Sequence, residues 1–259
     1  MDLFSTPFDF TAVDFLEKME VPAYKIASFE LVDIPLIQRC AATGKPLIMS
    51  TGMATEQEIR EAIAAARGAG CRDLALLKCT SAYPSAAADM NLRTIPDMIS
   101  RFCTVVGLSD HTLDLAVPIA SVALGGRVIE KHLTMSRLSP GPDSAFSLEP
   151  HEFKAMVQAV RTTQEALGQA QYQPGPKELG MRIYRRSLFA ASDIAEGEEF
   201  TPQNVRSIRP ADGLHTRYYN DIIGKRAATS IAFGTPLREE HLSSPLAIST
   251  AQESKEANA

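Results

Sequence analysis

The sequence has 259 residues, of which 45% are hydrophobic and 22% charged, a composition typical of a soluble globular protein that buries a sizeable core. Its formal net charge of −5 leaves no broad basic surface, which argues against nucleic acid and anionic membranes as partners. The four cysteines lack CxxC spacing, and no apolar run approaches the roughly 20 residues of a membrane span. We therefore expect reduced thiols, a cytoplasmic location and no signal peptide in the opening MDLFSTPFDF.

Short apolar runs with strand character recur along the first half of the chain, at residues 3–6, 23–27, 46–50, 74–79, 104–108 and 127–132. Helical patterns separate them. The clearest follows Thr55, which forms a capping box with Glu58 ahead of apolar residues at helical spacing. Repeated strand and helix units with nearly continuous apolar strands predict parallel strands covered by helices.

The polar residues that end these runs favour a barrel over an open doubly wound sheet. Hydroxyl, aspartate, lysine or histidine side chains follow every run, and in a barrel all strand ends converge on one face. A closed barrel needs eight strands, and six are counted here. The expected fold class is therefore α/β, a (β/α)8 TIM-barrel type lacking its first two βα units.

Beyond the barrel the pattern changes. Pro150 is expected at the first position of a last barrel helix, and a Gly-, Pro- and Gln-rich stretch follows it. We assign residues 1–168 to a partial barrel, 169–182 to a linker, 183–246 to a small β-rich domain and 247–259 to a disordered tail.

Two histidines follow neighbouring predicted strands, His111 in GLSDHT and His132 in IEKHL. Their imidazoles could face the same barrel mouth and bind one divalent ion, although both could equally be hydrogen-bonded packing residues. His151, His215 and His241 lack such a neighbour and are expected on the surface or in caps.

Lys25 and a set of strand-end hydroxyls would form a cradle for phosphate and carboxylate oxygens; the hydroxyls belong to Ser28, Ser50, Thr51, Ser81 and Ser109. Taken singly, each hydroxyl could instead cap the next helix. Lys25 lies inside an apolar strand, where it could pair with Glu30 or Glu130, or form a Schiff base as in an aldolase. Asp143 could contact a polyol or cap a turn, and Arg209 reads as a surface charge.

Taken together, the motifs FSTPFD, AYKIASFE, KPLIMSTGMAT, LLKCTSAYP, GLSDHT, IEKH and GPDSAFSLEP resemble the sialic acid synthase family. RRSLFAASDIAEGE, NVRSIRP and IGKRA with FGTPL resemble that family's antifreeze-like SAF domain. Within the family, the phenylalanine of KIASFE and the segment NVRSIRPADGLH look closest to pseudaminic acid synthases. N-acetylneuraminic and legionaminic acid synthases are near alternatives.

The resemblance implies a condensation of phosphoenolpyruvate with an amino-sugar aldehyde, usually with manganese. His111 and His132 would be metal ligands, and these two with Lys25 and Tyr83 would be the catalytic residues. Lys25, Ser28, Ser50, Ser81 and Ser109 would hold phosphoenolpyruvate, Tyr83, Asp143 and Glu30 would face the sugar, and Thr6 is a further substrate contact. Family members are domain-swapped homodimers, so Arg209 would reach the partner subunit's barrel.

Family members begin with two further βα units, which carry a glutamate and a lysine that this sequence lacks. Two hypotheses therefore compete with the synthase. One is a remnant that only binds metal or a partner barrel, and the other is the lysine-dependent aldolase.

Overall fold

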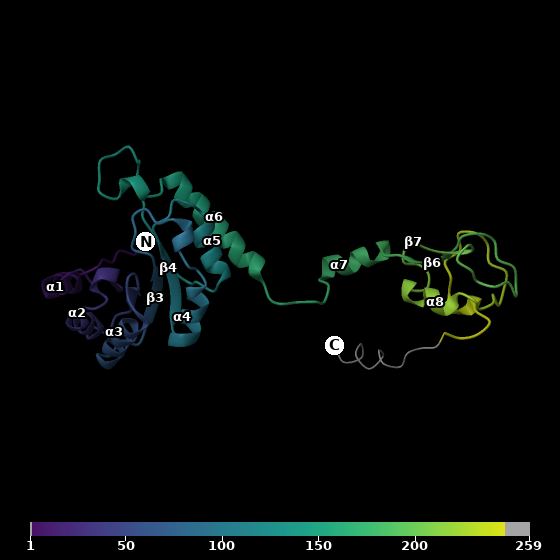
Figure 1. The fold of residues 1–259 in the computed structure, drawn as a ribbon, viewed down its shortest axis with the longest axis horizontal. Helices are drawn as coiled ribbons and strands as arrows, with labels where there is room; N and C mark the ends of the chain where they lie inside the picture. Colours follow the sequence, from purple (N-terminus) through teal and green to yellow (C-terminus); the bar gives the residue numbers. More distant parts are fainter. Residues whose placement is uncertain (1, 247–259) are drawn as a thin grey trace. The chain divides into compact units, whose positions relative to one another are not determined.

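A computed structural model describes residues 2–246, which divide into two compact units with the boundary between Gln169 and Ala170 (Figure 1). The predicted disordered tail lies outside the described residues. All four cysteines are free thiols. Within residues 2–246 no helix is both long and apolar enough to cross a bilayer.

The first unit is a parallel sheet with helices between its strands. The strands are β1 (Tyr24–Ile26), β2 (Leu47–Ser50), β3 (Leu74–Cys79), β4 (Val105–Asp110) and β5 (Ile129–Lys131). The helices are α1 (Phe10–Lys18), α2 (Ile34–Ala41), α3 (Glu56–Gly68), α4 (Thr94–Phe102), α5 (Ala116–Ala123) and α6 (Pro150–Leu167).

The strands pair in the order β1-β2-β3-β4-β5, each with its neighbour in the chain. A doubly wound sheet would reverse direction at a switch point, whereas successive right-handed crossovers in one direction place the helices on one face. The sheet is thus a parallel half-barrel, which confirms the expected fold class.

The predicted strand at residues 3–6 is wrong. The structure places only an isolated parallel bridge there, between Ser5 and Tyr24. Pro7 follows Thr6 and has no amide hydrogen with which to continue the ladder. The extended backbone nevertheless brings Thr6 to the edge of the sheet.

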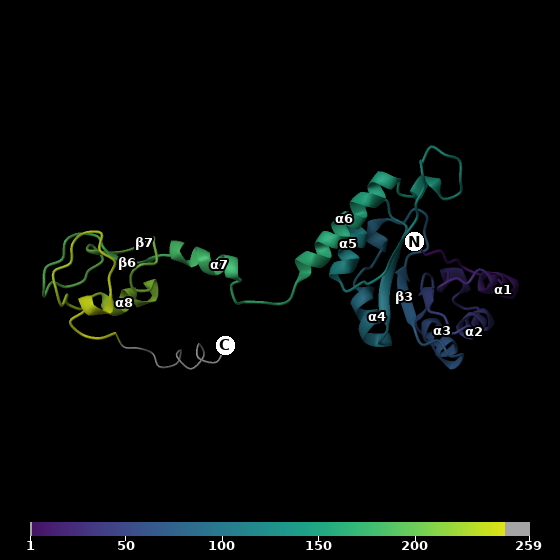
Figure 2. The ribbon, with the colours of Figure 1, turned by 180° about the vertical axis from the view of Figure 1, so that it is seen from behind.

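Helix boundaries follow local capping. Thr55 and Glu58 form the predicted capping box at the start of α3, and Pro150 occupies the predicted first turn of α6. Helix α6 packs beside α5 (Figures 1 and 2). The main core lies between the sheet and its helices and includes Ile26, Met49, Leu76, Val106 and Leu108 from the strands.

Strand register sorts side chains onto two faces. Cys79 pairs with Ser109 and Ser109 with Glu130, so these three share one face, on which Lys25 and Ser50 also lie. The alternate residues face the helices. The polar face and the apolar core are therefore opposite sides of the same strands.

The second unit contains α7 (Pro176–Met181), α8 (Tyr219–Ile222) and the antiparallel pair β6 (Ser187–Ala190) and β7 (Val205–Ile208). Further isolated bridges join its loops. Its separate core is built on Leu188, Phe200, Val205, Ile222 and Leu237.

We predict that Gly107→Ala destabilises the first unit. A Cβ at Gly107 in β4 would lie 2.2 Å from the carbonyl oxygen of Val128 and 2.8 Å from Cδ2 of Leu77. The Val128 carbonyl belongs to the backbone and cannot move away easily. We therefore expect the free energy of unfolding, measured in urea, to fall by about 1–3 kcal/mol.

Gly68→Ala is the matched control, because a Cβ there meets no atom within 4 Å. It should leave stability unchanged or raise it by roughly 0.5–1 kcal/mol. Equal unfolding midpoints for the two variants would show that the space beside Gly107 is not tight.

Candidate active site

A cavity of about 380 Å³ lies at the carboxyl ends of the strands in the first unit. Its lining contains Thr6, Lys25, Ser28, Ser50, Tyr83, Ser109, His111 and His132, all of which the sequence predicts as site residues. The parallel sheet brings these residues together from five strand ends and the segment before β1. Cys79, Glu130 and Lys131 also line it.

The two histidines lie next to each other, with ring centroids 5.3 Å apart. Nδ1 of His111 lies 2.9 Å from the carbonyl oxygen of Thr80. Because a carbonyl can only accept, Nδ1 carries the hydrogen, and in the neutral ring Nε2 then carries the lone pair. A hydrogen bond from one ring nitrogen to a backbone carbonyl commonly orients a histidine that binds a metal through its other nitrogen.

The pKa values of the two imidazoles shift in opposite directions. Burial acts to lower that of His111, but hydrogen bonds with Cys79 and Thr80 outweigh it and raise the pKa. Burial and the neighbouring His111 together lower the pKa of His132. Nδ1 of His132 is 3.6 Å from Oδ2 of Asp143, so the Asp143 side chain lies beside this imidazole rather than capping the following turn.

An aromatic wall covers one side of the histidine pair. The ring centroid of Tyr83 is 4.3 Å from that of His111 and 6.3 Å from that of His132. Phe146 packs against both Tyr83 and His132. This wall gives the cavity an apolar surface beside its donors.

Lys25 lies opposite the histidines on β1, with its side chain buried. Its ammonium donates to the Ile26 carbonyl at 3.0 Å and is 3.5 Å from Oε2 of Glu130. Of the two predicted partners, Glu130 is therefore the one observed. Burial lowers the pKa of Lys25, against the opposing attraction of Glu130. Glu130 also accepts a 2.6 Å hydrogen bond from Ser109.

One buried hydroxyl in the lining lacks a partner. Ser50 is 2% exposed, and within residues 2–246 its Oγ has no hydrogen bond. Buried polar atoms are nearly always satisfied, so an orphan hydroxyl in a polar cavity indicates a ligand or water. Nearby, the Gly52 amide donates to Oγ of Ser28 at 3.0 Å, and a Cβ on Gly52 would collide with the hydroxyls of Ser28 and Ser81. These hydroxyls leave no room for a side chain at position 52.

Three predicted site residues of the first unit lie outside the lining, namely Glu30, Ser81 and Asp143, the last of which lies beside His132. Oγ of Ser81 is 3.7 Å from Sγ of Cys79, which does line the cavity. Glu30 does not line the cavity, and its Oε2 is buried without a partner among the described residues. Thr51 donates to the Leu77 carbonyl and caps no helix.

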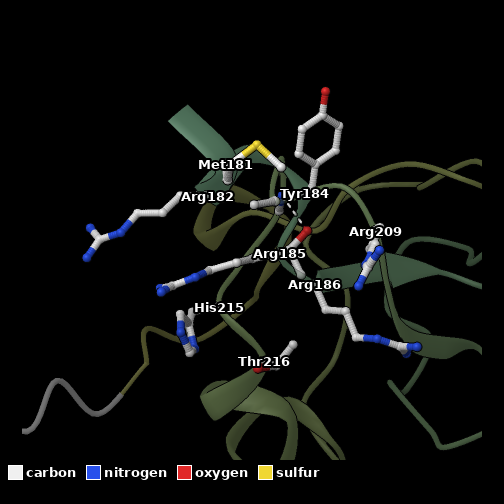
Figure 3. A pocket seen from close by; sticks show the side chains of 11 residues that line it. Met181, Arg182, Tyr184, Arg185, Arg186, Arg209, His215 and Thr216 are labelled. Atoms are coloured by element: carbon white, nitrogen blue, oxygen red, sulfur yellow. Dashed lines mark hydrogen bonds between the residues drawn. The ribbon is translucent and has the colours of Figure 1, made fainter. Parts of the chain in front are cut away.

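Arg209 belongs to the second unit, where it lines a separate basic cavity of about 1040 Å³ (Figure 3). Arg182, Arg185 and Arg186 share this cavity, with Arg185 on the side of His215. No ion pair found within residues 2–246 includes any of these four arginines. The cavity is therefore strongly positive.

The remaining histidines match their predicted roles. His215 accepts from the Arg217 amide and His241 from the Arg238 amide, while His151 is exposed.

Sequence reasoning missed Cys79 and treated Glu130 only as a partner for Lys25. Cys79 is buried beside His111, Ser28 and Ser81. Strand alternation could have identified Cys79. Residues 75, 77 and 79 point to the same face of β3, and Cys79 is the last of them before the polar strand end.

Comparisons with known proteins agree with this architecture. The NeuB family model matches residues 1–172 and the SAF domain model residues 185–243. The pseudaminic acid synthase of Campylobacter jejuni is 45% identical over 236 residues, which cover 91% of this chain and 69% of that protein. The N,N'-diacetyllegionaminic acid synthase of Legionella pneumophila is 38% identical over 93% of this chain and 69% of that protein.

Among solved structures, the spore coat polysaccharide biosynthesis protein SpsE of Bacillus subtilis superimposes with a TM-score of 0.63 at 31% sequence identity. The match covers 93% of this chain and 73% of that one.

We predict that Cys79, although buried, reacts with iodoacetamide near neutral pH. Burial acts to raise its pKa, but hydrogen bonds with His111, Ser28 and Ser81 lower it from 9.0 to about 7. The thiolate is the nucleophile, so labelling should rise with pH through a midpoint near 7, followed by mass spectrometry in metal-free buffer.

Cys40 and Cys71 provide internal controls, because burial raises the pKa of both thiols. They should stay unlabelled until the protein is denatured. A labelling midpoint for Cys79 near 9 would mean that these hydrogen bonds do not stabilise its thiolate.

Proposed function

Because the chain belongs to the NeuB family and carries a SAF domain, we propose that it condenses phosphoenolpyruvate with a 2,4-diacetamido-2,4,6-trideoxy-hexose aldehyde to give pseudaminic acid and phosphate. The observation that carries the proposal is the cavity in which two imidazoles face a buried lysine and an unsatisfied hydroxyl. The choice of sugar rests on the higher identity to a pseudaminic than to a legionaminic acid synthase.

Phosphoenolpyruvate carries a phosphate and a carboxylate, and the β1–β4 side of the cavity suits both. Lys25 supplies the positive charge, and the hydroxyls of Ser28, Ser50 and Ser109 supply hydrogen bonds. The free Oγ of Ser50 would gain its missing partner from such an oxyanion. Glu130 holds the Lys25 ammonium in place through their ion pair.

The sugar aldehyde would lie on the histidine side. Tyr83 offers a ring face and a hydroxyl, and Asp143, 3.6 Å from His132, offers a carboxylate to a polyol. C3 of the enol would attack the aldehyde carbonyl, water would add at C2, and phosphate would leave by cleavage of its C–O bond. One water is consumed, so the atoms balance.

His111 and His132 fit a divalent ion such as Mn²⁺, since both are nitrogen ligands and the Thr80 carbonyl leaves Nε2 of His111 free. No group of three His, Cys, Asp or Glu side chains within residues 2–246 could hold a metal, so oxygen atoms of water or substrate would complete the coordination. When bound, the ion would act as a Lewis acid on the aldehyde oxygen.

Phosphate release from phosphoenolpyruvate in the presence of Mn²⁺ tests the proposal. We expect turnover with 2,4-diacetamido-2,4,6-trideoxy-L-altrose, none with N-acetylmannosamine, and a loss of at least about 100-fold in His111→Ala, which removes a ligand. His151→Ala is the control, because that imidazole is exposed on α6.

Turnover with N-acetylmannosamine alone would instead assign an N-acetylneuraminic acid synthase. Trapping of pyruvate on Lys25 by borohydride would favour an aldolase. Absence of turnover with either sugar, together with Mn²⁺ binding, would favour a remnant that only binds metal.

We further propose that Arg209 contacts the sugar in the partner subunit of a homodimer. Its guanidinium lines a cavity without a carboxylate in the lining, which supports a role in ligand contact rather than a structural ion pair. Arg209→Ala should then lower kcat/KM for the sugar by about 10- to 100-fold, the cost of one or two charge-assisted hydrogen bonds.

Mixing two variants of low activity tests the exchange between subunits. A hybrid dimer of Arg209→Ala and His111→Ala would hold one site with both residues intact, so activity should reappear on mixing. Activity that stays at the level of the separate variants would place Arg209 and His111 of the same subunit in one site, or leave Arg209 outside it.

A further inference from the structure

A buried ion pair joins the ends of β4 and β5, directly before the two histidines. Nζ of Lys131 is 2.6 Å from Oδ2 of Asp110, and the two side chains are only 1% and 0% exposed. Asp110 and Lys131 are register partners across the two strands. His111 and His132 are the next residues of those strands.

The pair lies on the face of the sheet opposite the cavity residues. Ser109 and Glu130 are paired on the cavity face and hydrogen-bonded to each other, so Asp110 and Lys131 point toward the helices. Lys131 is part of the cavity lining, but its side chain is only 1% exposed, so the charged ends of the pair are covered and do not contact the substrate of the proposed function.

Both members of the pair also hold the backbone that follows His111. Asp110 accepts from the Thr112 amide at 2.9 Å and from the Thr112 hydroxyl at 3.2 Å. Lys131 donates to the Thr112 carbonyl as well. The segment that carries His111 is thus fixed to the strand that carries His132.

Stability alone is a weak reason to keep such a pair. Removing two charges from water costs about as much as their attraction returns, and replacing a buried pair by apolar residues is often neutral or stabilising. What the pair uniquely specifies is geometry, because charge, register and the bonds to Thr112 allow one arrangement of these two strand ends.

We propose that Asp110 and Lys131 are positioning residues that set the spacing of His111 and His132 for a shared divalent ion. The inference rests on the proposed function, since it takes the two histidines as the metal ligands. The imidazole spacing of 5.3 Å between ring centroids would then be a property of the ion pair, not of the histidines alone.

Mn²⁺ binding to the purified chain, followed by the electron paramagnetic resonance signal of free Mn²⁺, tests this without substrate. Asp110→Leu combined with Lys131→Met removes both charges together and leaves neither unpaired. The buried Thr112 amide and hydroxyl lose their acceptor, so we expect a somewhat lower thermal unfolding midpoint, and at temperatures below it an Mn²⁺ affinity weakened by about 10- to 100-fold, as for other residues that orient metal ligands.

Asp110→Glu is the second variant, in case the double variant does not fold. It keeps the ion pair but moves the carboxylate by one methylene, so it should fold and still weaken Mn²⁺ binding. Glu17→Leu with Lys45→Met is the matched control, because that pair, at 2.6 Å, joins α1 to the residue two positions before β2 at the other end of the strands. It should leave Mn²⁺ affinity unchanged.

Wild-type affinity in a folded Asp110→Leu/Lys131→Met variant, or in Asp110→Glu, would overturn the inference and leave the metal assignment intact. His111→Ala in the same titration tests the metal assignment separately from the positioning role. If His111→Ala binds Mn²⁺ as tightly as the wild type, or if the wild type does not bind Mn²⁺, the histidines are not the ligands. The proposed positioning role is then wrong as well.

Discussion

Parallel pairing of five consecutive strands is the constraint on which the rest of this structure depends. Parallel neighbours place their carboxyl ends on the same edge, so residues far apart in the sequence, such as Lys25 and Glu130, become neighbours across the cavity. Each crossover helix buries the opposite face against an apolar core. The polar edge can therefore collect charge and hydroxyl groups while the core remains apolar.

Alternation along each strand divides the work between the two faces. The side chains of Cys79, Ser109 and Glu130 share the cavity face, whereas the buried side chains of Asp110 and Lys131 point to the opposite face and join the two strands there. A one-residue slip of β5 against β4 would turn Lys131 toward the cavity face and Glu130 away from it, and would break the pair with Asp110. Register at this strand pair is thus as much a part of the site as the side chains themselves.

Much of this architecture could be predicted from the sequence, because apolar runs, polar strand ends and the Thr55 capping box are local patterns. The proximity of the two histidines could also be predicted, because both residues follow neighbouring strands. The strand predicted for residues 3–6 was wrong. The prediction rested on the apolar pattern of these residues and did not take into account that Pro7, which follows them, ends the pairing. Cys79 and the Asp110–Lys131 pair were missed because only the register tells which face a strand residue occupies. The position of Arg209 in its own basic cavity depends on a loop packing that no periodicity encodes.

The contact between His111 and Thr80 has an evolutionary consequence. The acceptor that selects the tautomer of His111 is a main-chain carbonyl, not a side chain. Substitution at position 80 cannot delete it, so the imidazole keeps its orientation through drift in the neighbouring sequence as long as the end of β3 holds its path. The substrate-facing loops could therefore diverge in sequence during evolution while the orientation of this imidazole is retained.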